Sequence, residues 1–234
     1  MRLRFWLLIA VMLVCYALPW VINPGVSLTL GGYDLGEWAS LHEAVRGEQP
    51  PLLTSFLLRL PLALVAVLIG WGAQPHPPAT AQPHPPAPSP KGEGVKKSAS
   101  PPNPLSQGRG GVKRWVLPVV AILLITAALL PPLEILDSPN DPNYQQQALV
   151  AGIALVGGLI GVSGIVQRVA TVVMVGIGVV GAAAIVGGLG KAYSLMQGFS
   201  LPVSVGTGGV LLAGLFAMVA VGAAIRWWGD RRAG

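Results

Sequence analysis

The chain of 234 residues is 53% hydrophobic and only 10% charged, with a formal net charge of +6. Soluble domains carry about 25% charged residues, so this composition excludes an ordinary soluble enzyme. A mean hydropathy of +0.64 also excludes an intrinsically disordered chain. Several apolar runs have about 20 residues, the length with which a helix crosses a hydrocarbon core of roughly 30 Å. We therefore expect an all-α integral membrane protein.

Six apolar runs are predicted to be transmembrane helices. They lie near residues 5–21, 56–73, 114–132, 148–166, 169–190 and 207–226. The first follows a basic start, MRLR, which is also typical of a signal peptide. Because no small-x-small cleavage site follows, we expect an uncleaved signal anchor, whereas cleavage would leave five spans. The single cysteine, Cys15, lies in this run and allows no disulfide or cysteine-based metal site within the chain.

A short amphipathic helix is predicted at about residues 34–46, in the stretch GYDLGEWASLHEAVR. Asp34 is placed as its N-cap, and Glu37 three residues later would complete a capping box. Apolar residues follow at three- and four-residue spacings, which predicts a helix lying in the outer interface with Trp38 as its anchor. The alternatives are a lid over an outer cavity or a docking face for a partner. The candidate contacts on this helix are Leu35, Trp38 and Leu41.

Arg59 lies within the second predicted apolar run, close to its start. We expect its side chain to snorkel to the outer interface, since it lies near the start of the second span. Binding of a lipid phosphate and pairing with an outer acidic residue are the alternatives. Arg59 is therefore a further candidate interface contact.

Residues 74–113 are predicted to be a disordered cytoplasmic linker. The heptapeptide AQPHPPA occurs twice there, and proline-rich sequence of this kind cannot bury a core. Its two histidines, His76 and His84, supply only half of a usual zinc ligand set, so no metal site is predicted. The linker separates a two-helix hairpin, residues 1–73, from a four-helix bundle, residues 114–234.

Glycine is abundant in the last three spans, and small residues recur there four positions apart. This spacing lets helix backbones approach closely in a membrane. Because only Gln167 and Arg168 link the fourth and fifth spans, we expect these two to form an antiparallel hairpin. The glycines could pack spans four to six together or receive a helix of a partner subunit. The candidate contacts are Gly157, Gly161, Gly178 and Gly187.

The charge distribution predicts the orientation. With both termini in the cytoplasm, twelve of the fifteen Lys and Arg residues lie inside, and seven of the nine acids lie outside. The net positive charge is thus explained by topology, and no nucleic-acid partner is expected. The predicted location is the inner (plasma) membrane.

The apolar stretches of spans three to six contain no ionisable residue. This absence argues against a proton-coupled pump, an intramembrane enzyme or haem ligation by histidine. We expect no cofactor and no catalytic residue. The leading hypothesis is a non-enzymatic subunit of a larger membrane assembly, with the lipid bilayer and other membrane subunits as partners. The alternative is a permease component for a small or lipid-like solute.

Overall fold

A computed structural model describes residues 2–24, 28–72, 111–165, 169–199 and 202–233 of this predominantly helical membrane protein. The predicted linker, with both of its histidines, falls almost wholly outside these residues. The helices are α1 (Arg2–Ala17), α2 (Gly32–Leu41), α3 (Glu43–Arg46), α4 (Leu53–Gly72), α5 (Gly111–Leu129), the 3-10 turn η2 (Leu133–Leu136), α6 (Pro142–Ser163), α7 (Ala170–Gly198) and α8 (Thr207–Ala233).

Four of the described helices, α4, α6, α7 and α8, are long and apolar enough to cross a membrane. They coincide with the second, fourth, fifth and sixth predicted spans. Two shorter apolar helices, Leu3–Ala17 and Trp115–Leu129, correspond to the first and third. At 1.5 Å per residue a 15-residue stretch covers about 22 Å, less than the roughly 30 Å core.

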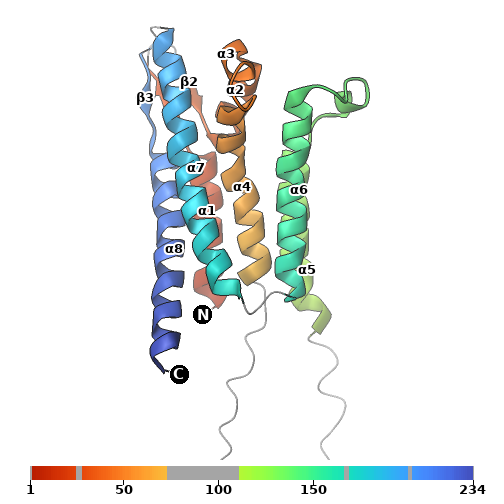
Figure 1. Ribbon diagram of the computed structural model, residues 1–234, viewed down its shortest axis with the longest axis vertical. Helices are drawn as coiled ribbons and strands as arrows, with labels where there is room; N and C mark the ends of the chain where they lie inside the picture. The colour runs from red at the N-terminus through yellow and green to blue at the C-terminus, as the bar shows by residue number, and fades with distance from the viewer. Residues whose placement is uncertain (1, 25–27, 73–110, 166–168, 200–201, 234) are drawn as a thin grey trace, which may run out of the picture.

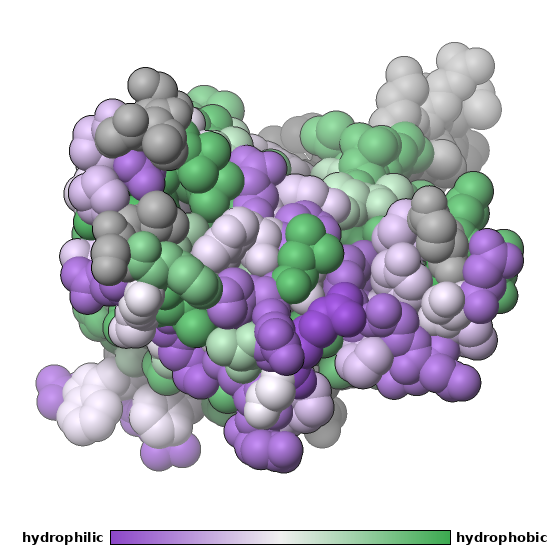
Figure 2. Space-filling model, turned by 90° about the horizontal axis from the view of Figure 1, so that it is seen from above, coloured by the Kyte–Doolittle hydropathy of each residue, from purple (hydrophilic) through white to green (hydrophobic). Residues whose placement is uncertain are grey.

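The six longer helices run side by side and alternate in direction along the chain (Figure 1). Helices α2 and α3 lie at one end of the bundle, which we call the outer end. Both termini lie at the opposite end, which we call the terminal end. Seen from the outer end, hydrophilic residues gather in the middle of the face, among patches of hydrophobic residues (Figure 2).

Helix α4 occupies the centre of the bundle. Within its most apolar 18 residues, 83% are buried, and it packs against α1, α5, α6 and α7. Helices α6 and α7, the fourth and fifth predicted spans, run antiparallel as expected (Figure 1). In the described part of the chain they make little contact with each other, because each packs on α4.

Glycines set the closest helix contacts. A Cβ atom added to Gly70 of α4 would collide with the carbonyl oxygen of Gly158 of α6, so the two backbones touch. On α7, a Cβ atom at Gly178 would lie 2.6 Å from the backbone oxygen of Phe216 of α8. Lipid provides no hydrophobic force between helices, so the van der Waals contacts that this close approach allows help to hold the helices together.

Three short strands at the outer end were not predicted, and they depart from an all-α chain. Strands β1 (Val21–Asn23), β2 (Leu28–Leu30) and β3 (Ser204–Val205) form an antiparallel sheet in the order β2-β1-β3. The pairing joins the end of α1 to the start of α8. It continues beyond the strands, where the Gly206 amide donates to the Trp20 carbonyl at 2.7 Å.

Candidate functional site

The predicted outer helix begins two residues earlier, is interrupted at His42 between α2 and α3, and is capped differently. Its N-cap is Gly31, and Asp34 stands at the third helical position, where it accepts a hydrogen bond from the Gly31 amide at 3.4 Å. The assignment of Asp34 as N-cap was therefore wrong. Glycine is required at Gly32 because an added Cβ atom would lie 2.9 Å from the rings of Tyr16 and Trp20. The different cap leaves Glu37 available for another partner.

The predicted apolar stripe of α2 is buried against the bundle in one part and exposed in another. Leu35 is fully buried where α2 packs on α4, whereas Leu41 is 72% exposed. Trp38 is half-buried, and its ring lies 5.8 Å from that of His42, which in turn meets Phe199 at 4.9 Å. The helix therefore docks on the bundle through one edge and presents Leu41 outward.

Arg59 lies at the centre of a polar cluster that we call the Arg59 network. Its side chain is 1% exposed, and its Nη2 atom donates to Glu37 Oε1 at 2.6 Å. The expectation that Arg59 snorkels to the interface was wrong, and pairing with an outer acid, the alternative, is observed. The reason is position: Arg59 lies six residues into α4, about 9 Å below its start, and α2 covers it.

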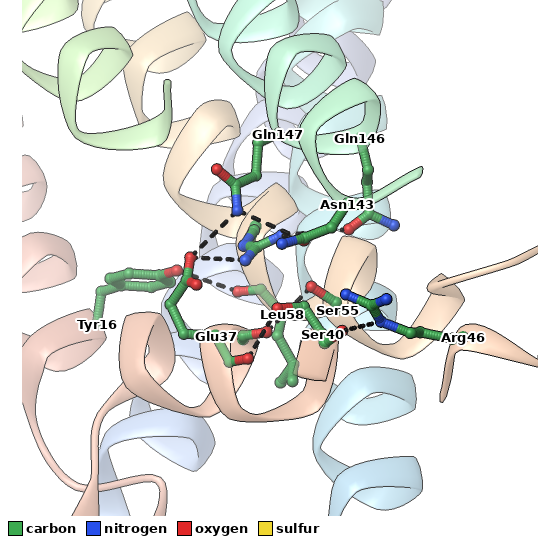
Figure 3. A network of polar contacts seen from close by, with 11 residues as sticks. Tyr16, Glu37, Ser40, Arg46, Ser55, Leu58, Asn143, Gln146 and Gln147 are labelled. Carbon is green, nitrogen blue, oxygen red and sulfur yellow. Dashed lines mark hydrogen bonds and ion pairs between the residues drawn. The ribbon is translucent and has the colours of Figure 1, made fainter. Parts of the chain in front are cut away.

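Helix α6 supplies the remaining acceptors of the network. Nη1 of Arg59 donates to Asn143 Oδ1 at 3.1 Å and to Gln146 Oε1 at 3.4 Å. Gln147 Nε2 donates to both Glu37 Oε1 and Asn143 Oδ1, each at 3.4 Å. Figure 3 shows Glu37, Asn143 and Gln147 converging on this point. The network thus joins α2, α4 and α6.

The contact between α2 and α4 is closest at Gly36. A Cβ atom there would lie 3.2 Å from Arg59 Cγ and 3.6 Å from Arg59 Nε. Ser55 donates to the Gly36 carbonyl at 3.0 Å. The Nε atom of Arg59 is buried and has no hydrogen-bond partner among the described residues. Gly36 therefore packs against this atom without forming a hydrogen bond to it.

A second polar contact, centred on Glu48, fixes the start of α4. Glu48 accepts from the Thr54 amide at 2.8 Å, from the Thr54 hydroxyl at 2.6 Å and from Lys191 of α7 at 3.1 Å. Burial alone would raise the pKa of Glu48, but these hydrogen bonds outweigh burial and hold the pKa below its ordinary value. Glu48 thus caps α4 and ties it to α7.

Leu52, just before α4, adopts a left-handed backbone with φ of 60°. A non-glycine residue there costs of order 1–3 kcal/mol unless its surroundings fix it. Gln146 Nε2 donates to the Leu52 carbonyl at 2.6 Å, and the Leu52 amide donates to the Val45 carbonyl at 2.9 Å. The strained residue therefore links the loop after α3 to α6.

The chemistry that this arrangement offers is charge neutralisation and tethering. Arg59 holds Glu37 through the hydrogen bond at 2.6 Å. Tyr16 uses its hydroxyl to donate to the Leu58 carbonyl at 3.2 Å. In the described ranges, no group of three or more His, Cys, Asp or Glu residues could hold a metal ion.

The four candidate glycines lie in different surroundings. Gly157 and Gly161 of α6 face Val67 and Trp71 of α4, and Gly178 faces α8. A Cβ atom at Gly187 would meet only a side-chain carbon of Leu57, at an ordinary 3.5 Å. The first three thus lie in helix contacts within the chain, and Gly187 does so only loosely.

One face of α7 has no partner in the described part of the chain, and we call it the open face. Its residues are not buried, and they alternate at four- and three-residue spacings: Val172, Gly176, Val179, Ala183, Val186 and Gly190. Cβ atoms added to Gly176 and Gly190 would meet nothing within 4 Å. Beside it, α7 and α8 form an apolar groove of about 280 Å³, lined in part by Val186, Gly190, Tyr193, Gly209 and Val210.

The sequence reasoning missed the amide residues of α6 and the role of Glu48. The polar run NYQQQ at the start of α6 was the available signal, because its four amide side chains at a helix start need partners. No family model, curated protein or solved structure matches the chain.

Proposed function

We propose that the chain is a non-enzymatic, multi-pass subunit of the inner (plasma) membrane that packs within a larger membrane assembly. Six spans and two cytoplasmic termini are part of this proposal. The observation that carries it is the open face of α7. The proposed partner is a transmembrane helix of another subunit.

The open face has the properties that favour helix association in lipid. Small residues recur every seven positions at Gly176, Ala183 and Gly190, and valines recur at the same interval between them. Small residues let a second backbone approach, and the valines give it side chains to pack against. Because an added Cβ atom meets nothing at Gly176 or Gly190, packing within the chain does not require glycine there.

Helix α8 extends the same surface. Val210 is 60% exposed and lines the groove that borders the open face. Gly214 follows four residues later on the same side of α8, and an added Cβ atom there also meets nothing within 4 Å. Two antiparallel helices with an apolar groove between them would offer a partner helix a continuous binding surface.

The Arg59 network supports the proposal from the outer end. It fixes α2 on α4 and α6, and so holds Trp38 and the 72% exposed Leu41 at a defined position. A preorganised contact loses less conformational entropy on binding than a mobile one. The outer helix would thereby give a partner a second, smaller contact.

The test is purification of the full chain in a mild detergent, followed by mass spectrometry of what travels with it. We expect stoichiometric membrane partners, and we expect Gly176→Leu with Gly190→Leu to release them. The matched control is Gly152→Leu on α6, since a Cβ atom at Gly152 also meets nothing within 4 Å. A monomer from the unaltered chain, or equal loss in the control, would contradict the proposal. Solute uptake into proteoliposomes by the purified chain would instead support the permease alternative.

A further inference from the structure

Helix α8 is longer than a helix needs to be to cross a membrane core. Its 27 residues measure about 40 Å, whereas a core of roughly 30 Å needs about 20 residues. Counted from Thr207, the core is crossed near Arg226. At the terminal end, α8 reaches beyond the neighbouring helices (Figure 1). We therefore expect the segment from Arg226 to Arg232 to lie at the level of the lipid headgroups.

Two arginines in this segment are stacked on two tryptophans. The guanidinium carbon of Arg231 lies 3.9 Å from the centre of the Trp227 ring, and that of Arg232 lies 5.2 Å from the Trp228 ring. Each pair is four residues apart, so both stacks run along the helix axis. Trp227 is 38% exposed and Trp228 is 57% exposed, so both rings are accessible from outside.

The stacking leaves the hydrogen-bond donors of the guanidinium groups available. A ring occupies the flat face of an arginine, whereas its N–H groups point outward in the plane and match the oxygens of a phosphate. Neither arginine forms an ion pair with a described carboxylate side chain. The stack also holds each guanidinium in place, which lowers the entropy lost on binding.

Exposed basic residues lie on the parts of α1 and α8 at the terminal end of the bundle (Figure 1). Among the side chains that the structure describes there, they are Arg4, Arg226, Arg231 and Arg232. A surface of this charge is complementary to an anionic membrane leaflet.

We propose that the C-terminal end of α8 is a binding site for an anionic phospholipid. Arg231 and Arg232 bind the headgroup phosphate, and Trp227 and Trp228 lie at the boundary between headgroups and acyl chains. Ile225, which is 67% exposed, faces the chains below them. This site goes beyond the proposed function, because it involves neither the open face nor a partner subunit.

The experiment compares lipid retention by the full chain. The protein is exchanged into nanodiscs that contain phosphatidylglycerol and phosphatidylcholine in equal amounts, released, and examined by native mass spectrometry. We expect retained phosphatidylglycerol to exceed phosphatidylcholine. Each arginine near an anionic surface contributes about fivefold in affinity, so Arg231→Gln with Arg232→Gln should reduce phosphatidylglycerol binding by about 30-fold. Lysine at both positions keeps the charge and should restore part of the binding.

The matched control is Arg46→Gln, because the Arg46 side chain is 49% exposed and its helix, α3, lies at the outer end, opposite the C-terminal end of α8 (Figure 1). It should leave lipid retention unchanged, and equal helical circular dichroism will show that each variant is folded. Unchanged retention in the double glutamine variant would overturn the proposal. So would complete displacement of the lipid by millimolar inorganic phosphate, which would indicate an open anion site. Loss of a protein partner with no change in lipid would overturn it as well.

Discussion

The ion pair between Glu37 and Arg59 gives the sharpest test of the outer-end architecture. Glu37→Gln removes the negative charge but keeps the size of the side chain and one acceptor oxygen. It leaves Arg59, at 1% exposure, as a buried charge without a counter-ion. Breaking a buried pair costs about 3–5 kcal/mol, and the 37% exposure of the Glu37 side chain places the loss near 3 kcal/mol. For a chain of this size, that corresponds to a drop in Tm of about 6–12 °C.

Cys15 provides the assay. It is the single cysteine of the sequence, and at 4% exposure it is buried in the core beside α8. A dye that fluoresces on reaction with thiols will therefore report the temperature at which α1 leaves the bundle. The control is Arg46→Gln, which removes an exposed ion pair with Asp141 at 3.9 Å and a hydrogen bond to the Ser40 carbonyl at 3.2 Å, and should cost about 1–2 kcal/mol.

A second substitution decides whether the cost comes from the charge. Adding Arg59→Met to Glu37→Gln removes the uncompensated cation, and the amides of Gln146 and Gln147 keep other partners, the Leu52 carbonyl and Asn143. The double variant should therefore have a higher Tm than Glu37→Gln alone, with a coupling of about 0.5–3 kcal/mol. Additive losses would refute the reasoning, because they would show that the two side chains act independently.

Three further predictions concern other contacts. The folded state holds the pKa of Glu48 below its ordinary value of 4.5, so the ionised side chain stabilises the fold above that pH. This stabilisation is lost as the pH falls through the lowered pKa. Glu48→Gln should therefore cost about 1–2 kcal/mol at pH 7 and weaken the acid dependence of thermal unfolding. Gly178→Leu should overpack the contact with α8, cost about 1–3 kcal/mol and so lower the Tm of the isolated chain. Gly176→Leu should leave the Tm unchanged, because an added side chain there meets nothing. Trp38→Ala should reduce membrane seating or the yield of assembled complex more than His42→Ala, and the reverse order would direct attention to chemistry at His42.

The long apolar helices could be predicted because their signal is local. An apolar run of 20 residues is visible in the sequence whatever it packs against. Helix α4 follows its predicted run within three residues, whereas α6 begins six residues earlier and α7 and α8 continue for about two further turns. The central position of α4 could not be predicted in the same way. Its contacts with α6 and α7 join segments far apart in the chain, and an apolar run does not reveal its neighbours. The apolar character of α4 on all sides was the one available signal that it is buried.

The candidate site was predicted only in part, for the same physical reason. The charges of Arg59 and Glu37 were noted, but their pairing depends on how α2 lies across α4. Asn143 is 84 residues from Arg59, and no periodicity connects them. Glycine spacing predicted close helix contacts without identifying the partner helix. Gly178 packs on α8, whereas Gly187 has only a loose contact with Leu57. The strands, of two or three residues each, are too short to show an alternating pattern.

The distances along the chain within the Arg59 network bear on how the protein enters the membrane. Glu37 precedes Arg59 by 22 residues, whereas Asn143 follows it by 84. An arginine costs about 2.5–3.5 kcal/mol on insertion at the middle of a spanning helix, and this is an upper limit for Arg59, which lies near the start of α4. During synthesis, the counter-ion of Arg59 has already been translated when α4 leaves the ribosome, and the amides of α6 arrive later. The first hairpin can therefore neutralise its own charge as it is inserted, and the rest of the bundle then assembles around a helix that is already shielded.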